Sequence, residues 1–132
     1  MHALILLAAG TGSRMKDSVS DKLLADLNGK AVLLYSLEAF IKTGAFNRYL
    51  VVYRDLEQKS KIQAQIESIN FTPTNIVYVQ GGASRQASVL NALGSINEAI
   101  DLIAIHDGAR PLIKESFILR LLEEAQKHGS AV

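Results

Sequence analysis

The sequence has no cysteine, no tryptophan and only 2 prolines among its 132 residues. Without cysteine it cannot build a disulfide scaffold, a zinc finger, an iron–sulfur cluster or a thiol nucleophile, and it suits a reducing compartment such as the cytoplasm. Charge is also nearly balanced, with 14 Lys and Arg against 13 Asp and Glu. This balance and the lack of a basic, aromatic stripe argue against nucleic-acid binding. No apolar run approaches the roughly 18 residues of a membrane span, so we expect no membrane partner.

What is present indicates one globular domain covering residues 1–132, since 48% of the residues are hydrophobic and 20% are charged. Four short apolar runs predict β-strands: Leu4–Ala8, Leu50–Tyr53, Ile76–Val79 and Leu102–His106. The runs are continuous rather than alternating, which is typical of parallel strands that are covered on both faces.

Segments of helical period lie between and after these runs. Their apolar stripes are Val32, Leu33, Leu37, Phe40 and Ile41; Ile62 and Ile66 within 57–68; Val89, Leu90, Leu93 and Ile96; and Ile118, Leu121, Leu122 and Ala125, with Gly129 as a C-terminal stop. Strand–helix alternation predicts an α/β fold, a three-layer sandwich with a mainly parallel sheet. Ligands of such sheets bind beyond the carboxyl ends of the strands, so the loops there are the candidate site.

The loop after the first strand combines small residues with cations. Gly10, Thr11 and Gly12 would let backbone N–H groups approach an anion, and Arg14 and Lys22 would add positive charge. The pattern is neither a dinucleotide fingerprint, which needs a third glycine, nor a Walker A loop. A tight turn without a ligand remains an alternative.

Two more strand ends carry candidate residues. Gly81 and Gly82 precede a helix that Ser84 could cap, and Ser88 would lie near its first turn. Asp107 ends another strand, where a carboxylate could hold Mg²⁺ or form a surface pair with Arg110. The neighbouring His106 is interpreted as a packed or hydrogen-bonded residue rather than a metal ligand or general base.

Together these motifs resemble the 2-C-methyl-D-erythritol 4-phosphate cytidylyltransferase family, and the resemblance runs from the first strand to the end of the chain. The matching residues are Leu7-Ala8-Ala9-Gly10-Thr11-Gly12-Ser13-Arg14-Met15, Lys22, Gly81-Gly82-x-x-Arg85-x-x-Ser88-Val89 and His106-Asp107-Gly108-Ala109-Arg110-Pro111. The resemblance implies a Rossmann-like sandwich of the nucleotide-diphospho-sugar transferase type. It also implies an enzyme that transfers CMP from CTP to 2-C-methyl-D-erythritol 4-phosphate, releases pyrophosphate and serves non-mevalonate isoprenoid biosynthesis.

The resemblance further assigns roles to single residues. It implies that Arg14 and Lys22 are catalytic cations and that Asp107 binds the cofactor Mg²⁺. The residues that it places around CTP are Ala8, Ala9, Gly10, Thr11, Gly12, Gly82, Ser88 and Asp107. It also implies that this chain is the N-terminal portion of a longer catalytic domain, whose remainder supplies acceptor contacts and an arm that pairs two subunits into a homodimer.

Two positions depart from the family pattern, and two other functions stay open. Asp21 precedes Lys22 where the family often has proline, and Ala83 stands where it frequently has an aspartate that touches the nucleotide. Ribitol 5-phosphate is an alternative acceptor for the same chemistry. A non-catalytic nucleotide-binding domain is the alternative from another class.

Overall fold

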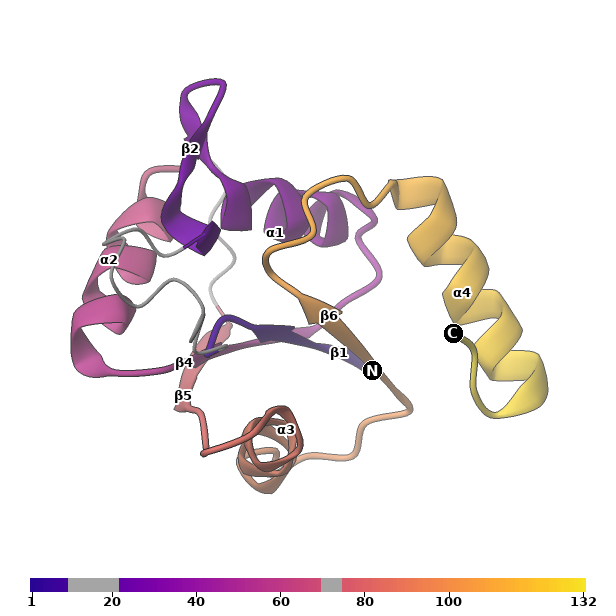
Figure 1. Cartoon of the computed structure of the whole chain (residues 1–132). Coiled ribbons are helices and arrows are strands. Elements are labelled where there is room, and N and C mark those ends of the chain that lie inside the picture. The colour runs from indigo at the N-terminus through magenta and orange to yellow at the C-terminus, as the bar shows by residue number, and fades with distance from the viewer. Residues whose placement is uncertain (10–21, 70–74) are drawn as a thin grey trace.

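A four-stranded parallel sheet forms the centre of the computed structural model, which describes residues 1–9, 22–69 and 75–132 (Figure 1). Its strands are β1 (His2–Leu7), β4 (Arg48–Tyr53), β5 (Ile76–Gln80) and β6 (Leu102–Asp107), in the order β5-β4-β1-β6. Ile5 of β1 is in register with Leu50 on one side and Ile105 on the other. The predicted mainly parallel sheet is therefore confirmed, with strand ends shifted by one or two residues.

Helices cover both faces of the sheet, as a three-layer sandwich requires (Figure 1). On one face α1 (Val32–Lys42), α2 (Leu56–Glu67) and α4 (Glu115–His128) contribute to a core that includes Leu4 and Leu6. On the other face α3 (Arg85–Gly94) packs on a smaller core built around Ile5. Successive side chains of β1 thus enter different cores, which explains why its sequence is apolar throughout.

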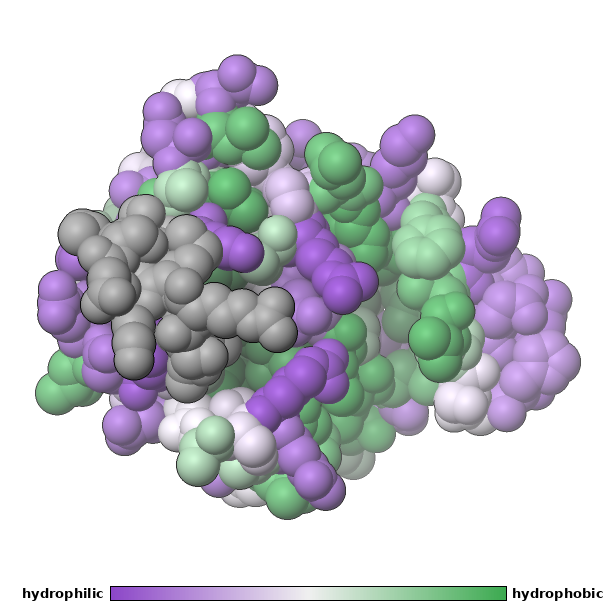
Figure 2. Space-filling model, in the orientation of Figure 1, coloured by the Kyte–Doolittle hydropathy of each residue, from purple (hydrophilic) through white to green (hydrophobic). Residues whose placement is uncertain are grey.

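The prediction that all four strands are buried on both faces is wrong for β5 and β6. Both lie at the edges of the described sheet, where a strand has one neighbour. Ile103 and Ile105 consequently keep 38% and 44% of their surface exposed. Figure 2 shows apolar surface lying open on this side of the molecule, between the sheet and α4.

The predicted apolar stripe of α3 is also partly wrong. Leu90 and Leu93 are exposed, whereas the buried positions of the helix are Ser88 and Ala92. Small residues on this face let the helix lie close to the strand ends, which matters for the site described below. The caps are as expected: Ser84 Oγ accepts from the Ala87 N–H, and Gly129 ends α4 with a φ of 85°.

A short hairpin, which is not among the elements predicted from the sequence, precedes α1. After a 3-10 turn, η2 (Lys22–Leu24), the antiparallel strands β2 (Asp26–Leu27) and β3 (Lys30–Ala31) pair around Asn28 and Gly29. Both turn residues have positive φ, 55° and 85°, which is the geometry that an Asn-Gly pair favours. Among the described residues, no helix is long and apolar enough to cross a membrane.

Candidate functional site

The strand order places a topological switch point, where a ligand-binding crevice is expected, between the carboxyl ends of β1 and β6. From β1 the chain moves outward to β4 and β5 and then returns to the opposite side of β1 to form β6. The connections after β1 and β6 therefore leave in different directions, and this switch point is where parallel sheets bind ligands. Ala8 and Ala9 follow β1, and Asp107 ends β6, so the predicted residues meet there.

Backbone hydrogen bonds join the strand ends at this edge. The Gly108 N–H donates to the Leu7 carbonyl at 2.9 Å, and the Gly81 N–H donates to the Tyr53 carbonyl at 2.7 Å. The approach is so close that a Cβ on Gly81 would lie 2.5 Å from the Ala9 Cβ. The glycine thus lets the segment after β5 contact the segment after β1.

The turn before α3 is built around the Ser88 hydroxyl. Ser88 is 4% exposed, and its Oγ accepts from the Gly82 N–H at 3.1 Å. A Cβ on Gly82 would lie 2.5 Å from the Ala87 Cβ, so this turn also requires glycine. Gly82 and Ser88, which were both predicted as nucleotide contacts, are joined by this hydrogen bond at the beginning of the helix.

Asp107 lies between two arginines. Arg85 Nε is 3.7 Å from Asp107 Oδ1, and Arg110 Nε is 3.7 Å from Asp107 Oδ2. All three side chains are partly exposed, so water screens the pairs and they stabilise the fold little. The two ion pairs matter for position instead. They keep the guanidinium groups of Arg85, from α3, and Arg110, from the loop after β6, beside the Asp107 carboxylate.

Side chains of α1 and β6 hold the loop after Asp107 in place. Its Arg110 carbonyl accepts from the Ser36 hydroxyl at 2.7 Å and lies 3.0 Å from His106 Nε2. Since a carbonyl can only accept, this contact requires the proton of the neutral ring to be on Nε2. His106 also packs against Phe40, with 5.3 Å between ring centroids. The interpretation of His106 as a packed, hydrogen-bonded residue agrees with these contacts.

Lys22 is exposed at the beginning of η2, next to a buried anchor. The following residue, Leu23, is 5% exposed, and its Cδ2 lies 2.8 Å from the position that a Gly108 Cβ would take. Leu23, the residue after Lys22, therefore packs against Gly108, the residue after Asp107. Lys22 and Asp107 therefore belong to the same end of the sheet.

Comparison with known proteins shows the family to which the chain belongs. The sequence model of the family "IspD: 2-C-methyl-D-erythritol 4-phosphate cytidylyltransferase" matches residues 1–132. The chain belongs to this family. Members of the IspD family are cytidylyltransferases, which are nucleotidyltransferases, and the resemblance seen in the sequence motifs is confirmed.

Individual relatives agree. The 2-C-methyl-D-erythritol 4-phosphate cytidylyltransferase of Endomicrobium trichonymphae is 38% identical, over 99% of this chain and 56% of its own length. The ribitol-5-phosphate cytidylyltransferase of Vibrio parahaemolyticus is 32% identical, over 100% of this chain and 56% of its own. The chain thus spans about half the length of these relatives.

Solved IspD structures share the fold. The chain superposes with a TM-score of 0.71 on the Francisella tularensis 2-C-methyl-D-erythritol 4-phosphate cytidylyltransferase, at 29% identity, covering 95% of this chain and 52% of that one. The 4-diphosphocytidyl-2C-methyl-D-erythritol synthase of Anaerococcus prevotii gives a TM-score of 0.79 at 24% identity, covering 96% and 52%. The α/β fold class is confirmed by these neighbours.

The IspD site expected from the sequence divides into two groups. Ala8, Ala9, Lys22, Gly82, Ser88 and Asp107 lie at the carboxyl edge of the sheet as described above. Gly10, Thr11, Gly12 and Arg14 lie outside the described residues. The ligand contacts of both groups remain predictions.

Two residues near the site were not predicted. Arg85 was noted as part of a motif, but its charge was not assigned to Asp107. Gln58 was not considered, although it is 1% exposed and its amide donates to the Ala8 carbonyl at 2.8 Å. An aspartate followed three positions later by a glutamine is a local signal of a helix start, but no local pattern could show that the Gln58 side chain reaches β1.

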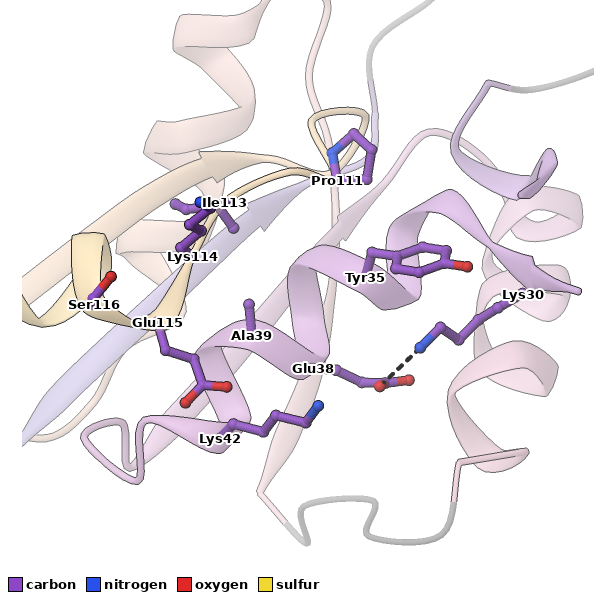
Figure 3. A pocket seen from close by; sticks show the side chains of 10 residues that line it. All are labelled: Lys30, Tyr35, Glu38, Ala39, Lys42, Pro111, Ile113, Lys114, Glu115 and Ser116. Atoms are coloured by element: carbon purple, nitrogen blue, oxygen red, sulfur yellow. Dashed lines mark hydrogen bonds and ion pairs between the residues drawn. The ribbon is translucent and has the colours of Figure 1, made fainter. Parts of the chain in front are cut away.

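A separate open groove of about 420 Å³ lies between α1 and the beginning of α4 (Figure 3). It is lined by Lys30, Tyr35, Glu38, Ala39, Lys42, Pro111, Ile113, Lys114, Glu115 and Ser116. Lys30 is paired with Glu38 at 3.0 Å across its rim. None of the predicted CTP-binding residues that the structure describes lines it. Within the described segments, no three His, Asp or Glu side chains gather closely enough to form a metal cluster of their own.

Proposed function

We propose that the protein transfers CMP from CTP to 2-C-methyl-D-erythritol 4-phosphate and releases pyrophosphate. The observation that carries this proposal is the meeting of the Ala9, Gly81–Ser88 and Asp107 segments at the β1–β6 switch point. Membership of the IspD family and the 38% identity to a named methylerythritol enzyme support it.

The chemistry suits a site made of backbone donors and cations. An oxygen of the acceptor phosphate attacks the α-phosphorus of CTP, and the bond from that phosphorus to the oxygen bridging to the β-phosphate breaks. Because the attacking phosphate is already ionised at neutral pH, no general base is needed. The protein's main task is to align two anions and to stabilise charge on the transferring phosphorus and the departing pyrophosphate. We assign that task to Arg14 and Lys22.

Asp107 fits the expected Mg²⁺. Its carboxylate is 38% exposed at the end of β6, and the two neighbouring guanidinium groups, at 3.7 Å, leave its oxygens accessible from solvent. Mg²⁺ is usually held by one or two carboxylates, water and substrate phosphates, so a single aspartate is enough. Bound there, the ion would neutralise charge on the triphosphate.

Ribitol 5-phosphate is the one alternative acceptor that a specific observation favours. The relative from Vibrio parahaemolyticus is named for ribitol 5-phosphate and is 32% identical to this chain. Both acceptors are polyol phosphates that use the same bond-forming step. We favour 2-C-methyl-D-erythritol 4-phosphate because several relatives are named for it, and homodimer formation stays a prediction.

The test is a coupled pyrophosphate assay of the whole protein with CTP, Mg²⁺ and each polyol phosphate in turn. We expect pyrophosphate release when CTP is combined with 2-C-methyl-D-erythritol 4-phosphate. Much less should be released when ATP or GTP replaces CTP. A faster reaction with ribitol 5-phosphate would show that ribitol 5-phosphate is the acceptor. CTP binding without release of pyrophosphate from CTP, whichever acceptor is added, would instead favour a non-catalytic nucleotide-binding domain.

A further inference from the structure

Gln58 is a buried polar side chain that joins the ends of two neighbouring strands. It lies in the first turn of α2 and is 1% exposed. A carboxamide at this depth costs free energy unless both its ends are hydrogen-bonded. Its Nε2 donates to the Ala8 carbonyl at 2.8 Å, and its Oε1 accepts from the Arg54 N–H at 2.6 Å.

These contacts fix the orientation of the peptide group between Ala8 and Ala9. The Ala8 N–H already donates to the Val52 carbonyl of β4 at 2.8 Å, so both backbone polar groups of Ala8 face the β4–α2 side. The peptide bond is planar and trans, and its C=O and N–H therefore point in opposite directions. With the Ala8 carbonyl turned toward Gln58, the Ala9 N–H is aimed toward the β6 side.

The β6 side of Ala9 is the proposed nucleotide crevice. There the Leu7 carbonyl receives the Gly108 N–H, immediately after Asp107. Ala9 itself is 8% exposed and lies against the glycine turn that contains Gly81. An N–H fixed in this direction is a preorganised donor for the ligand bound at the switch point.

We propose that Gln58 is a positioning residue for nucleotide binding, which acts by holding the Ala8–Ala9 peptide with the Ala9 N–H turned toward the crevice. The inference rests on the proposed function, because it takes CTP as the ligand. Gln58 touches no reacting atom, and its effect should therefore appear in the affinity for CTP rather than in the chemical step.

The test compares Gln58→Met with Gln63→Met in the whole protein. Methionine approximates the size of glutamine but cannot donate to the Ala8 carbonyl, and Gln63 lies further along the same helix. Calorimetric titration with CTP and Mg²⁺ should show an affinity about tenfold lower for Gln58→Met, the size expected when one hydrogen bond is lost, and little change for Gln63→Met. KM for CTP should rise in parallel, with kcat changed less than about threefold.

Amide hydrogen exchange provides a readout that needs no nucleotide. Exchange at Ala8, whose N–H donates to the Val52 carbonyl, should be faster in Gln58→Met than in Gln63→Met. A folded Gln58→Met protein with wild-type CTP affinity would overturn the inference, as would a loss of melting temperature with unchanged KM. If Gln58→Met does not fold, Gln58→Asn keeps a carboxamide but is one methylene shorter, so it cannot reach the Ala8 carbonyl as Gln58 does, and the same outcomes apply. Failure of the wild-type protein to bind CTP would overturn the proposed function itself.

Discussion

Arg85 Nε comes within 3.7 Å of Asp107 Oδ1, although the two residues belong to different strand–helix units. Arg85 is the first residue of α3, and Asp107 is the last residue of β6. The contact brings the beginning of the glycine-turn helix to the carboxylate at the switch point. Because both side chains are partly exposed, the pair adds little stability, and its importance is that it marks one end of the candidate site.

The first prediction concerns the carboxylate itself. Asp107→Asn should abolish Mg²⁺-dependent pyrophosphate release, because the amide keeps the shape of the side chain but loses the charge that a hard cation requires. Folding should be nearly unaffected, since the two arginine pairs are exposed. The measurements are turnover across a Mg²⁺ titration and the melting temperature.

Asp101 offers a matched control for that substitution. It lies just before the other end of β6, where its carboxylate pairs with the N-terminal amino group. Asp101→Asn should leave the Mg²⁺ dependence of turnover unchanged. Activity of Asp107→Asn that persists at low Mg²⁺ would instead reduce Asp107 to a partner of Arg85 and Arg110.

The second prediction concerns the assigned catalytic cations. Arg14→Ala and Lys22→Ala should each lower kcat by about 10²–10³, the usual cost of removing one charged group that stabilises a transition state. The affinity for CTP should fall much less. Lys16 is a cation two positions after Arg14 to which the resemblance assigns no role, so Lys16→Ala is the internal control and should matter little. A variant of Arg14 or Lys22 with near wild-type kcat would end that residue's assignment.

The positions of the site loops could be predicted from the sequence because they depend on topology. Apolar runs alternating with helical segments required a parallel sheet, and a parallel sheet collects its ligands at the carboxyl ends of the strands. The Ser84 cap and the Gly129 stop likewise depend on neighbours in the chain. Asn28-Gly29 is an equally local signal, in this case for a hairpin.

Long-range contacts could not be obtained in the same way. The bond from Gln58 to Ala8 depends on how α2 lies across the ends of β1 and β4. The exposure of Ile103 and Ile105 depends on the place of β6 at the edge of the described sheet. An apolar run is the same in either position, so its composition could not distinguish a central strand from an edge strand.

The third prediction uses the close contact between Gly81 and Ala9. Gly81→Ala places a methyl group 2.5 Å from the Ala9 Cβ and 2.8 Å from the Ser88 Oγ, so the two segments must separate. We expect a loss of about 1–3 kcal/mol in the free energy of unfolding, typical of overpacking, and weaker CTP binding. Urea denaturation and calorimetry measure the two effects.

Gly94 is the glycine to compare with it. It ends α3, and a Cβ there would meet nothing within 4 Å. Gly94→Ala should leave CTP binding unchanged and should be neutral or slightly stabilising, by up to about 1 kcal/mol, because alanine has less conformational freedom to lose. Equal stability and affinity for the two variants would show that the segments after β1 and β5 do not touch as described.

The last prediction is a dependence of stability on pH at the beginning of α2. Asp55 caps this helix by accepting from the Gln58 N–H at 2.8 Å, and that bond, with the Arg54 guanidinium, lowers the pKa of the Asp55 carboxyl from its ordinary value. A carboxyl whose pKa is lower in the folded state stabilises the fold above its unfolded pKa, about 3.9 for aspartate, and loses that contribution as pH falls through the folded pKa. Urea denaturation should therefore show wild type more stable than Asp55→Asn at neutral pH, with the difference shrinking below about pH 4. Asp55→Ala, which removes the cap as well as the charge, should cost about 1 kcal/mol at neutral pH. A difference between wild type and Asp55→Asn that stays constant down to pH values well below 3.9 would show that the charge of Asp55 does not contribute to capping α2.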